Sequence, residues 1–233
     1  MALVINQIMM IALRLKSTNQ IKAALNTTTA KQDKPKALRP KDAATLMLVD
    51  RKNARILMGK RSSKHVFMPD LYVFPGGRRD RNDWRLPVKT PLRDEVISHL
   101  LHDTSQKFTT STATALALAA ARELFEETSL NIQDSDGFNL QSFRYFARAI
   151  TPIGQSRRFD TRFFVSFCDE LEINASQAKD SDELVDLRWV NIYQPEDHPM
   201  PMITSKILKQ LQLRLKQSND LGFDAPPYFY NKI

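Results

Sequence analysis

Hydrophobic residues follow one another along the chain in two patterns, one typical of strands and the other of helices. Residues 43–49 form an apolar run of strand length, and residues 55–58 form a second one beyond the polar turn at 50–53. We predict that these two segments pair as a hairpin. Three further apolar segments are predicted to be strands, at residues 143–150, 161–168 and 187–190.

Three other segments carry apolar residues at helical spacing. Five of them between Leu92 and Leu101 predict a short amphipathic helix, and an alanine-rich run without Gly or Pro predicts the strongest helix at residues 112–128. A third helix is predicted at residues 203–216. Because strands and helices mix without regular βαβ alternation, we expect an α+β domain layered as an α/β/α sandwich.

Charge divides the chain into two parts. The net charge is +8, but residues 1–41 carry eight Lys and Arg against the single acid Asp33. We therefore expect a basic leader at 1–41, flexible or targeting, and one nearly neutral domain at 42–233. A neutral domain makes nucleic-acid binding an unfavoured interpretation.

The leader and the single cysteine provide information about the cellular compartment of the protein. Residues 1–15 are apolar but lack the positive start of a secretory signal, and no segment is long and apolar enough to span a bilayer. Cys168 lies in an apolar run and is interpreted as a buried strand thiol. We expect a cytoplasmic protein, with organellar targeting by the leader as the alternative.

The candidate chemistry lies at the end of the alanine-rich helix. Glu123, Glu126 and Glu127 stand at i, i+3 and i+4, so their carboxylates project from one side within a single turn. Such an oxygen-rich group suits Mg²⁺, with Mn²⁺ as the alternative, and Arg122 offsets part of the repulsion. A solvated acidic helix end is the other interpretation of this cluster.

A glycine pair provides a second signal. Gly76 and Gly77 follow Phe74-Pro75 in a chain of only six glycines, which indicates a tight turn that requires bare backbone.

Together these residues resemble the box of the Nudix hydrolases, which reads Gly, five residues, Glu, seven residues, Arg-Glu-apolar-x-Glu-Glu-x-Gly-apolar. Its second half matches residues 122–130, with Ser129 in place of the glycine, where a non-glycine residue resists a left-handed backbone. Its first half matches at Gly77, but 44 residues instead of 13 separate Gly77 from Arg122. We interpret residues 78–111 as an insertion, and find Thr114 where the middle glutamate belongs when counting back from Arg122.

A split box resembles the subgroup that contains the peroxisomal coenzyme A diphosphatases. The segments 60–63, 67–69, 150–152 and 158–164 also resemble that subgroup, whereas Val66 and Asp70 depart from its coenzyme A signature. The resemblance implies a Nudix fold with a mixed central sheet and a catalytic loop-helix-loop, and metal-dependent hydrolysis of a nucleoside diphosphate linked to another group. Coenzyme A or acyl-coenzyme A is the leading substrate.

Other functions stay open at this stage. The same fold serves NADH, ADP-ribose and nucleotide pyrophosphatases, and a catalytically silent Nudix module would bind RNA or protein instead. A homodimer is compatible with the sequence, with the insertion as a lid or a dimer surface.

The resemblance also implies roles for individual residues. Glu123, Glu126 and Glu127 would ligate the metal together with the Gly76 carbonyl, and Arg122 would orient a carboxylate. Glu183, just before a Trp-bearing strand, is the candidate general base, although it could equally be a solvated loop carboxylate. The predicted substrate-binding residues are Arg61, Phe74, Arg158 and Arg162, of which the three arginines match phosphate geometry.

Overall fold

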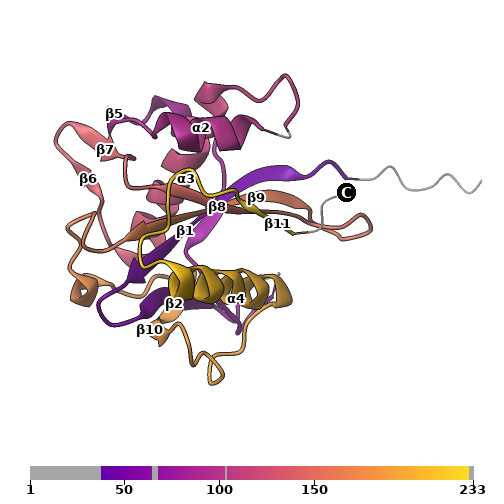
Figure 1. Ribbon diagram of the computed structural model, residues 1–233. Coiled ribbons are helices and arrows are strands. Elements are labelled where there is room, and N and C mark those ends of the chain that lie inside the picture. Colours follow the sequence, from indigo (N-terminus) through magenta and orange to yellow (C-terminus); the bar gives the residue numbers. More distant parts are fainter. Residues whose placement is uncertain (1–37, 65–67, 103, 231–233) are drawn as a thin grey trace, which may run out of the picture. The chain divides into compact units, whose positions relative to one another are not determined.

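The computed structural model describes residues 38–64, 68–102 and 104–230 (Figure 1). Most of the predicted basic leader, residues 1–37, lies outside the described residues, as do Val66 and Phe67. The predicted domain start is close to the first strand, which begins at Lys41.

A mixed sheet of eight strands forms the centre of the domain. Its path runs β10-β2-β1-β9-β8-β11, with short β3 and β4 pairing with β2 and β1. The pairs β1–β9 and β8–β11 are parallel, and the other pairs are antiparallel. The strands are β1 (Lys41–Asp50), β2 (Arg55–Arg61), β3 (Tyr72–Val73), β4 (Gly76–Arg78), β8 (Arg144–Ile150), β9 (Phe159–Phe167), β10 (Leu184–Asn191) and β11 (Tyr228–Tyr230).

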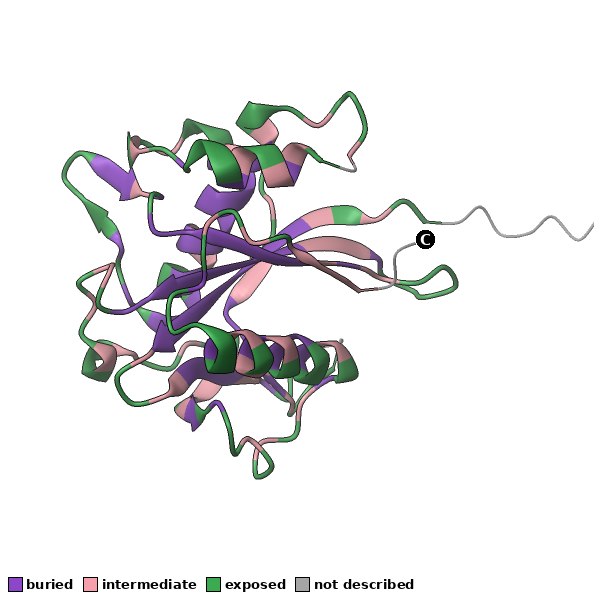
Figure 2. Ribbon diagram, viewed as in Figure 1, coloured by how far each residue is buried: buried purple, intermediate pink, exposed green. Residues whose placement is uncertain are grey.

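Helices cover both faces of this sheet, as the sequence predicts (Figure 1). Along β1, Leu46 and Leu48 pack with α2 (Asp94–Leu101) and α3 (Thr110–Thr128), whereas Met47 and Val49 pack with α4 (Met202–Gln217). This alternation follows from the two-residue period of a strand. Figure 2 shows the result, with buried sheet residues between helices whose outer sides are exposed.

The predicted hairpin, the strands at 143–150, 161–168 and 187–190, and all three helices are confirmed, each within a few residues of its predicted bounds. A second sheet of order β5-β7-β6 is new, with β5 (Val88–Thr90), β6 (Gln133–Asp134) and β7 (Gly137–Asn139). Strands of two or three residues are too short to show a periodicity.

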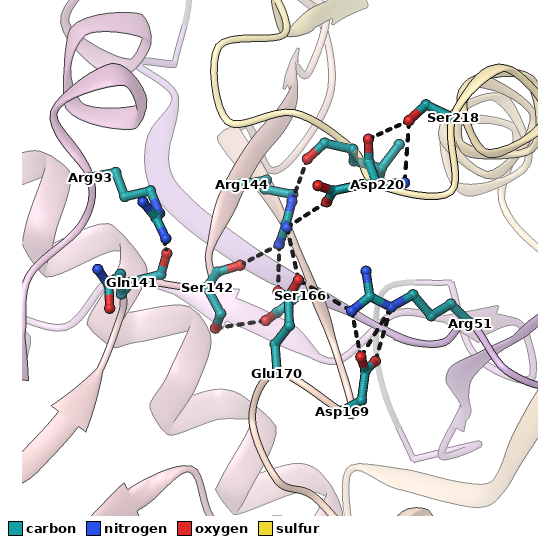
Figure 3. A network of polar contacts seen from close by, with 11 residues as sticks. Arg51, Arg93, Gln141, Ser142, Arg144, Ser166, Asp169, Glu170, Ser218 and Asp220 are labelled. Atoms are coloured by element: carbon teal, nitrogen blue, oxygen red, sulfur yellow. Dashed lines mark hydrogen bonds and ion pairs between the residues drawn. The ribbon is translucent and has the colours of Figure 1, made fainter.

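The segment after α4 is held to the sheet by one buried arginine (Figure 3). Arg144, on β8, donates to the carbonyl of Leu221, to Glu170 at 2.6 and 2.9 Å and to Asp220 at 3.0 Å. Its guanidinium also lies 4.8 Å from the ring of Phe167 and 4.0 Å from that of Phe223. These contacts tie residues 220–223 to the end of the sheet.

Two predictions about single features are also tested. Cys168 is buried, and burial raises the pKa of its thiol to about 12, which does not suit a nucleophile. Over the described ranges, none of the helices has the length and apolar character needed to cross a bilayer.

Candidate active site

Helix α3 presents its glutamates at a well-defined end. Its alanine-rich part is buried against the sheet, and the helix stops at Ser129, whose backbone is left-handed at φ 60°. The Ser129 N–H donates to the Phe125 carbonyl at 2.8 Å. Ser129 therefore adopts the left-handed backbone that a non-glycine residue was expected to resist. This conformation costs about 1–2 kcal/mol relative to glycine.

The glycine pair lies directly against two of the glutamates. Glu127 is only 4% exposed, and its Oε2 accepts a hydrogen bond from the Gly76 N–H at 2.8 Å. A Cβ atom at Gly77 would fall 2.4 Å from Oε1 of Glu123. The predicted need for bare backbone is confirmed, because any side chain at position 77 would displace a carboxylate.

Burial dominates the electrostatics of these carboxylates. Burial raises the pKa of Glu127 to about 8, although the Gly76 hydrogen bond opposes the shift. Burial also raises the pKa of Glu123, against the lowering effect of Arg122. Two partly desolvated carboxylates side by side form a site that a cation would stabilise.

Arg122 holds the glutamates from the other side. Its Nη1 donates to Glu123 Oε1 at 2.9 Å and to Glu126 Oε2 at 2.8 Å, while its Nε donates to Asp83 Oδ1 at 2.7 Å. Asp83 belongs to η1 (Asp83–Arg85) and is 1% exposed. Burial lowers the pKa of Arg122, but the bond to Asp83 and the charge of Glu123 outweigh it and raise the pKa, so the guanidinium stays charged.

Asp83 corrects the prediction that the middle acid of the box has no counterpart. Counting back from Arg122 reaches Thr114, but counting forward from Gly77 across five intervening residues reaches Asp83. The additional residues therefore lie between Asp83 and Arg122 rather than from residue 78 onward. Their helix α2 turns Val96 and Leu100 into the core beside α3.

Residues 179–187, here called the Glu183 loop, comprise the loop before β10 and the first residues of that strand up to its bulge, and they close the site. Its Lys179 N–H donates to the Thr128 carbonyl at 2.9 Å, and the Glu183 carbonyl accepts from the Ser62 N–H at 3.0 Å. Asp180 accepts from the N–H groups of Asp186 and Leu187 at 2.7 and 2.9 Å. The loop is thus attached both to the end of α3 and to β2, and its Glu183 carboxylate contributes to the raised pKa of Glu123 and Glu127, after burial.

The end of α3 and the Glu183 loop line a cavity of about 580 Å³ that is open to solvent. Six carboxylates line it, together with one hydroxyl: Glu123, Glu126, Glu127, Asp180, Ser181, Asp182 and Glu183. Oxygen ligands of this kind suit hard divalent cations. Among the described residues no three His, Cys, Asp or Glu side chains are grouped closely enough to hold one ion as they stand. Arg122 and the Gly76 N–H each bond to these glutamates through one oxygen only, so one oxygen of each carboxylate is left for a cation.

Comparison with known proteins agrees with this geometry. The family model of the NUDIX domain matches residues 113–211, which begin at α3 and include the second half of the box. Residues 113–211, less than half of the chain, are therefore similar to a NUDIX domain. It is 27% identical to nudix hydrolase 7 of Caenorhabditis elegans over 135 residues, which cover 56% of this chain and 45% of that protein. The chain thus matches less than half the length of this relative.

Solved structures show the same fold. A NUDIX hydrolase from Alicyclobacillus acidocaldarius superposes with a TM-score of 0.54 and 22% identity, covering 73% of this chain and 90% of that one. A MutT/nudix family protein from Enterococcus faecalis superposes with a TM-score of 0.51 and 13% identity, and the match covers 87% of this chain and 72% of that one. The layered mixed sheet of this chain is therefore the Nudix fold.

This fold places the four predicted substrate-binding residues in different surroundings. Arg61 lies near enough to Glu127 to lower its pKa, although burial of Glu127 outweighs this. Phe74 is 4% exposed and packs in the core under α4. Phe74 does not line the acidic cavity, and its predicted contact with substrate is not supported.

Arg158 and Arg162 are also buried away from the cavity. Arg158 donates to the carbonyls of Thr151 and Leu38 at 2.9 and 2.6 Å. Arg162 is 2% exposed and pairs with Asp160 and Asp42 at 3.0 and 3.3 Å. Arg158 is bonded to two backbone carbonyls, and Arg162 is paired with an acid of its own strand β9 and with one of β1. Their predicted role as phosphate clamps is therefore corrected to a structural one.

Proposed function

We propose that this Nudix domain hydrolyses the pyrophosphate bond of a nucleoside diphosphate linked to another group. The observation that carries the proposal is the open cavity with six carboxylates, three of them from one helix turn. Glu123, Glu126 and Glu127 would hold Mg²⁺ or Mn²⁺, with the Gly76 carbonyl beside them. When bound, the metal lowers the pKa of an attacking water and neutralises charge on the leaving oxygen.

The other residues of the site have supporting roles in this proposal. Arg122, fixed by Asp83, keeps the carboxylates of Glu123 and Glu126 on the cavity side of α3. Glu183 is exposed, on a loop tied at both ends, so it can accept a proton from water as the general base. Arg61 would bind a substrate phosphate in this proposal, which its electrostatic effect on Glu127 supports.

Coenzyme A or acyl-coenzyme A is the leading substrate in this proposal. The support is the resemblance to the split-box subgroup, now with the additional residues located between Asp83 and Arg122. NADH, ADP-ribose and nucleoside polyphosphates are the alternatives of the same chemistry.

A substrate screen tests the proposal. Purified protein with Mg²⁺ is offered coenzyme A, acyl-coenzyme A, NADH, ADP-ribose, diadenosine polyphosphates and nucleoside triphosphates, and release of the nucleotide product is measured by chromatography. We expect turnover of coenzyme A and its loss in Glu127→Gln with the fold retained. Glu95→Gln, an exposed acid on α2, is the matched control and keeps full activity.

A silent binding module would give a different result. It would turn over none of these compounds with Mg²⁺ or Mn²⁺, while calorimetry would still detect a bound nucleotide. In that case the hydrolase proposal would be wrong.

A further inference from the structure

The outer face of α4 carries a row of lysines and large apolar side chains. Met202, Lys206, Lys209, Leu213 and Lys216 follow one another at spacings of three and four residues, which places them along one side of the helix. All five are exposed, Met202 by 68% and Leu213 by 47%. The opposite side of α4 is buried in the core, so this row is an outward surface (Figure 2).

The charge of this face is uniformly positive. Helix α4 contains four Lys and Arg and no acid. The guanidinium of Arg214 is turned back, over the ring of Phe146 and onto the Pro226 carbonyl. For Lys206, Lys209 and Lys216 the structure shows no carboxylate at ion-pair distance within the residues that it describes. The acids nearest in sequence, at 196–197, 220 and 224, flank the helix ends.

Tyrosines extend the row at both ends. Tyr193 is 39% exposed, and the Lys216 ammonium lies 5.4 Å from the centre of its ring. At the other end the Tyr230 hydroxyl contacts Met202 Sδ at 3.6 Å. Tyr, Lys and exposed aliphatic side chains together are typical of surfaces that lie at a membrane–water interface.

We propose that this face of α4 docks on a bilayer that contains anionic lipids. The five positions extend over 15 residues, from Met202 to Lys216, and span roughly 21 Å. Lysines on flexible stems match a fluid layer of headgroups better than a fixed phosphate geometry. Met202 and Leu213 would enter the boundary between headgroups and acyl chains. A nucleic acid would leave these two aliphatic side chains without apolar contacts.

The position of the acidic cavity supports one orientation. Helix α3 with its glutamates packs on one face of the sheet and α4 on the other. An anionic surface attracts the lysine row and repels the carboxylates, so the docked protein keeps its cavity in water. Outside residues 1–41 the chain is nearly neutral, so the local row and not the overall charge would direct the domain.

Vesicle sedimentation of the full chain tests the proposal. We expect binding to phosphatidylcholine vesicles with added phosphatidylserine, weakened by salt, and little binding to phosphatidylcholine alone. Lys206→Glu with Lys209→Glu should weaken binding by about tenfold or more. Lys52→Glu with Lys107→Glu makes the same charge change at exposed positions outside α4 and should have little effect. Equal losses in the two double variants would refute the proposal.

A position-specific probe separates α4 from the basic leader, which is present in every variant. An environment-sensitive dye on Ser205→Cys should shift to shorter wavelength with anionic vesicles, whereas the dye on Lys107→Cys should not. Cys168 does not compete for the label because it is buried. If both dyes stay in water while the protein sediments, or if Lys206→Glu with Lys209→Glu abolishes binding to RNA but not to vesicles, α4 is not a membrane-docking face.

Discussion

At the scale of single residues, Asp83 is the anchor of the candidate site. It is almost completely buried, and its two oxygens accept from Arg122, which in turn contacts Glu123 and Glu126. Asp83→Asn retains the shape of the side chain but removes the negative charge that balances the guanidinium of Arg122. We expect activity to fall about 10–100-fold, as for residues that orient metal ligands.

Two quantities are measured: kcat with the substrate that the screen identifies, and the affinity of the protein for the metal. Asp94→Asn, an exposed acid at the start of α2, is the control. Unchanged metal affinity and kcat in Asp83→Asn would show that Arg122 does not need its partner.

Glu127 predicts a pH dependence of stability. Its pKa is about 8 in the folded protein, against 4.5 for a solvated glutamate side chain, because burial disfavours the charged form. The folded state therefore holds an additional proton, and its stabilising contribution is complete below pH 4.5 and lost as the pH rises through 8. Without metal, the free energy of unfolding should fall by up to about 1.4 kcal/mol per pH unit in this window.

Thermal unfolding in a chelator from pH 5 to 8 measures this dependence. Glu127→Gln cannot titrate and should show a flatter profile, while saturating Mg²⁺ should restore stability to the native protein at pH 8. The same slope in both proteins would contradict the assignment.

At the scale of elements, the Glu183 loop depends on Asp180. Both oxygens of Asp180 accept backbone N–H groups, at Asp186 and Leu187, where the strand β10 carries a bulge and Asp186 has φ 49°. Asp180→Ala removes both bonds and should lower kcat through misplacement of Glu183, with a smaller change in KM.

Asp182 provides the matched comparison. It lines the same cavity and is exposed, so Asp182→Ala removes the same charge without removing those backbone bonds. Steady-state kinetics should show the larger loss for Asp180→Ala. Equal losses would mean that only the charge of the cavity matters, and not the shape of the loop.

At the scale of the whole molecule, Arg144 connects the sheet to the segment after α4 (Figure 3). Arg144→Met would leave Glu170 without its bidentate partner and release residues 220–223. We expect a loss of about 2 kcal/mol in the free energy of unfolding, because Arg144 is buried whereas its partner Glu170 is 24% exposed and can be partly solvated when the arginine is removed. Chemical denaturation measures it, and Arg188→Ala, at an exposed pair with Asp186, should be nearly neutral.

Features that depend only on neighbours along the chain can be predicted from the amino-acid sequence. Hydrophobic period predicts the main strands and helices, and helix geometry places Glu123, Glu126 and Glu127 on one side wherever the helix packs. Gly76 and Gly77 were also predictable, because their rarity indicates a close approach. These features are local, so covalent geometry and propensity suffice to predict them.

Only the tertiary structure decided which distant residues meet. Asp83 reaches Arg122 across 39 positions, and Glu183 reaches α3 because its loop bonds to both Thr128 and Ser62. The fold likewise buried Arg158 against the Leu38 carbonyl and Arg162 against Asp42 of β1, each 120 positions away in the chain. The physical reason is that these partners are set by sheet register and by the packing of α3 on β1, which no spacing within one segment encodes.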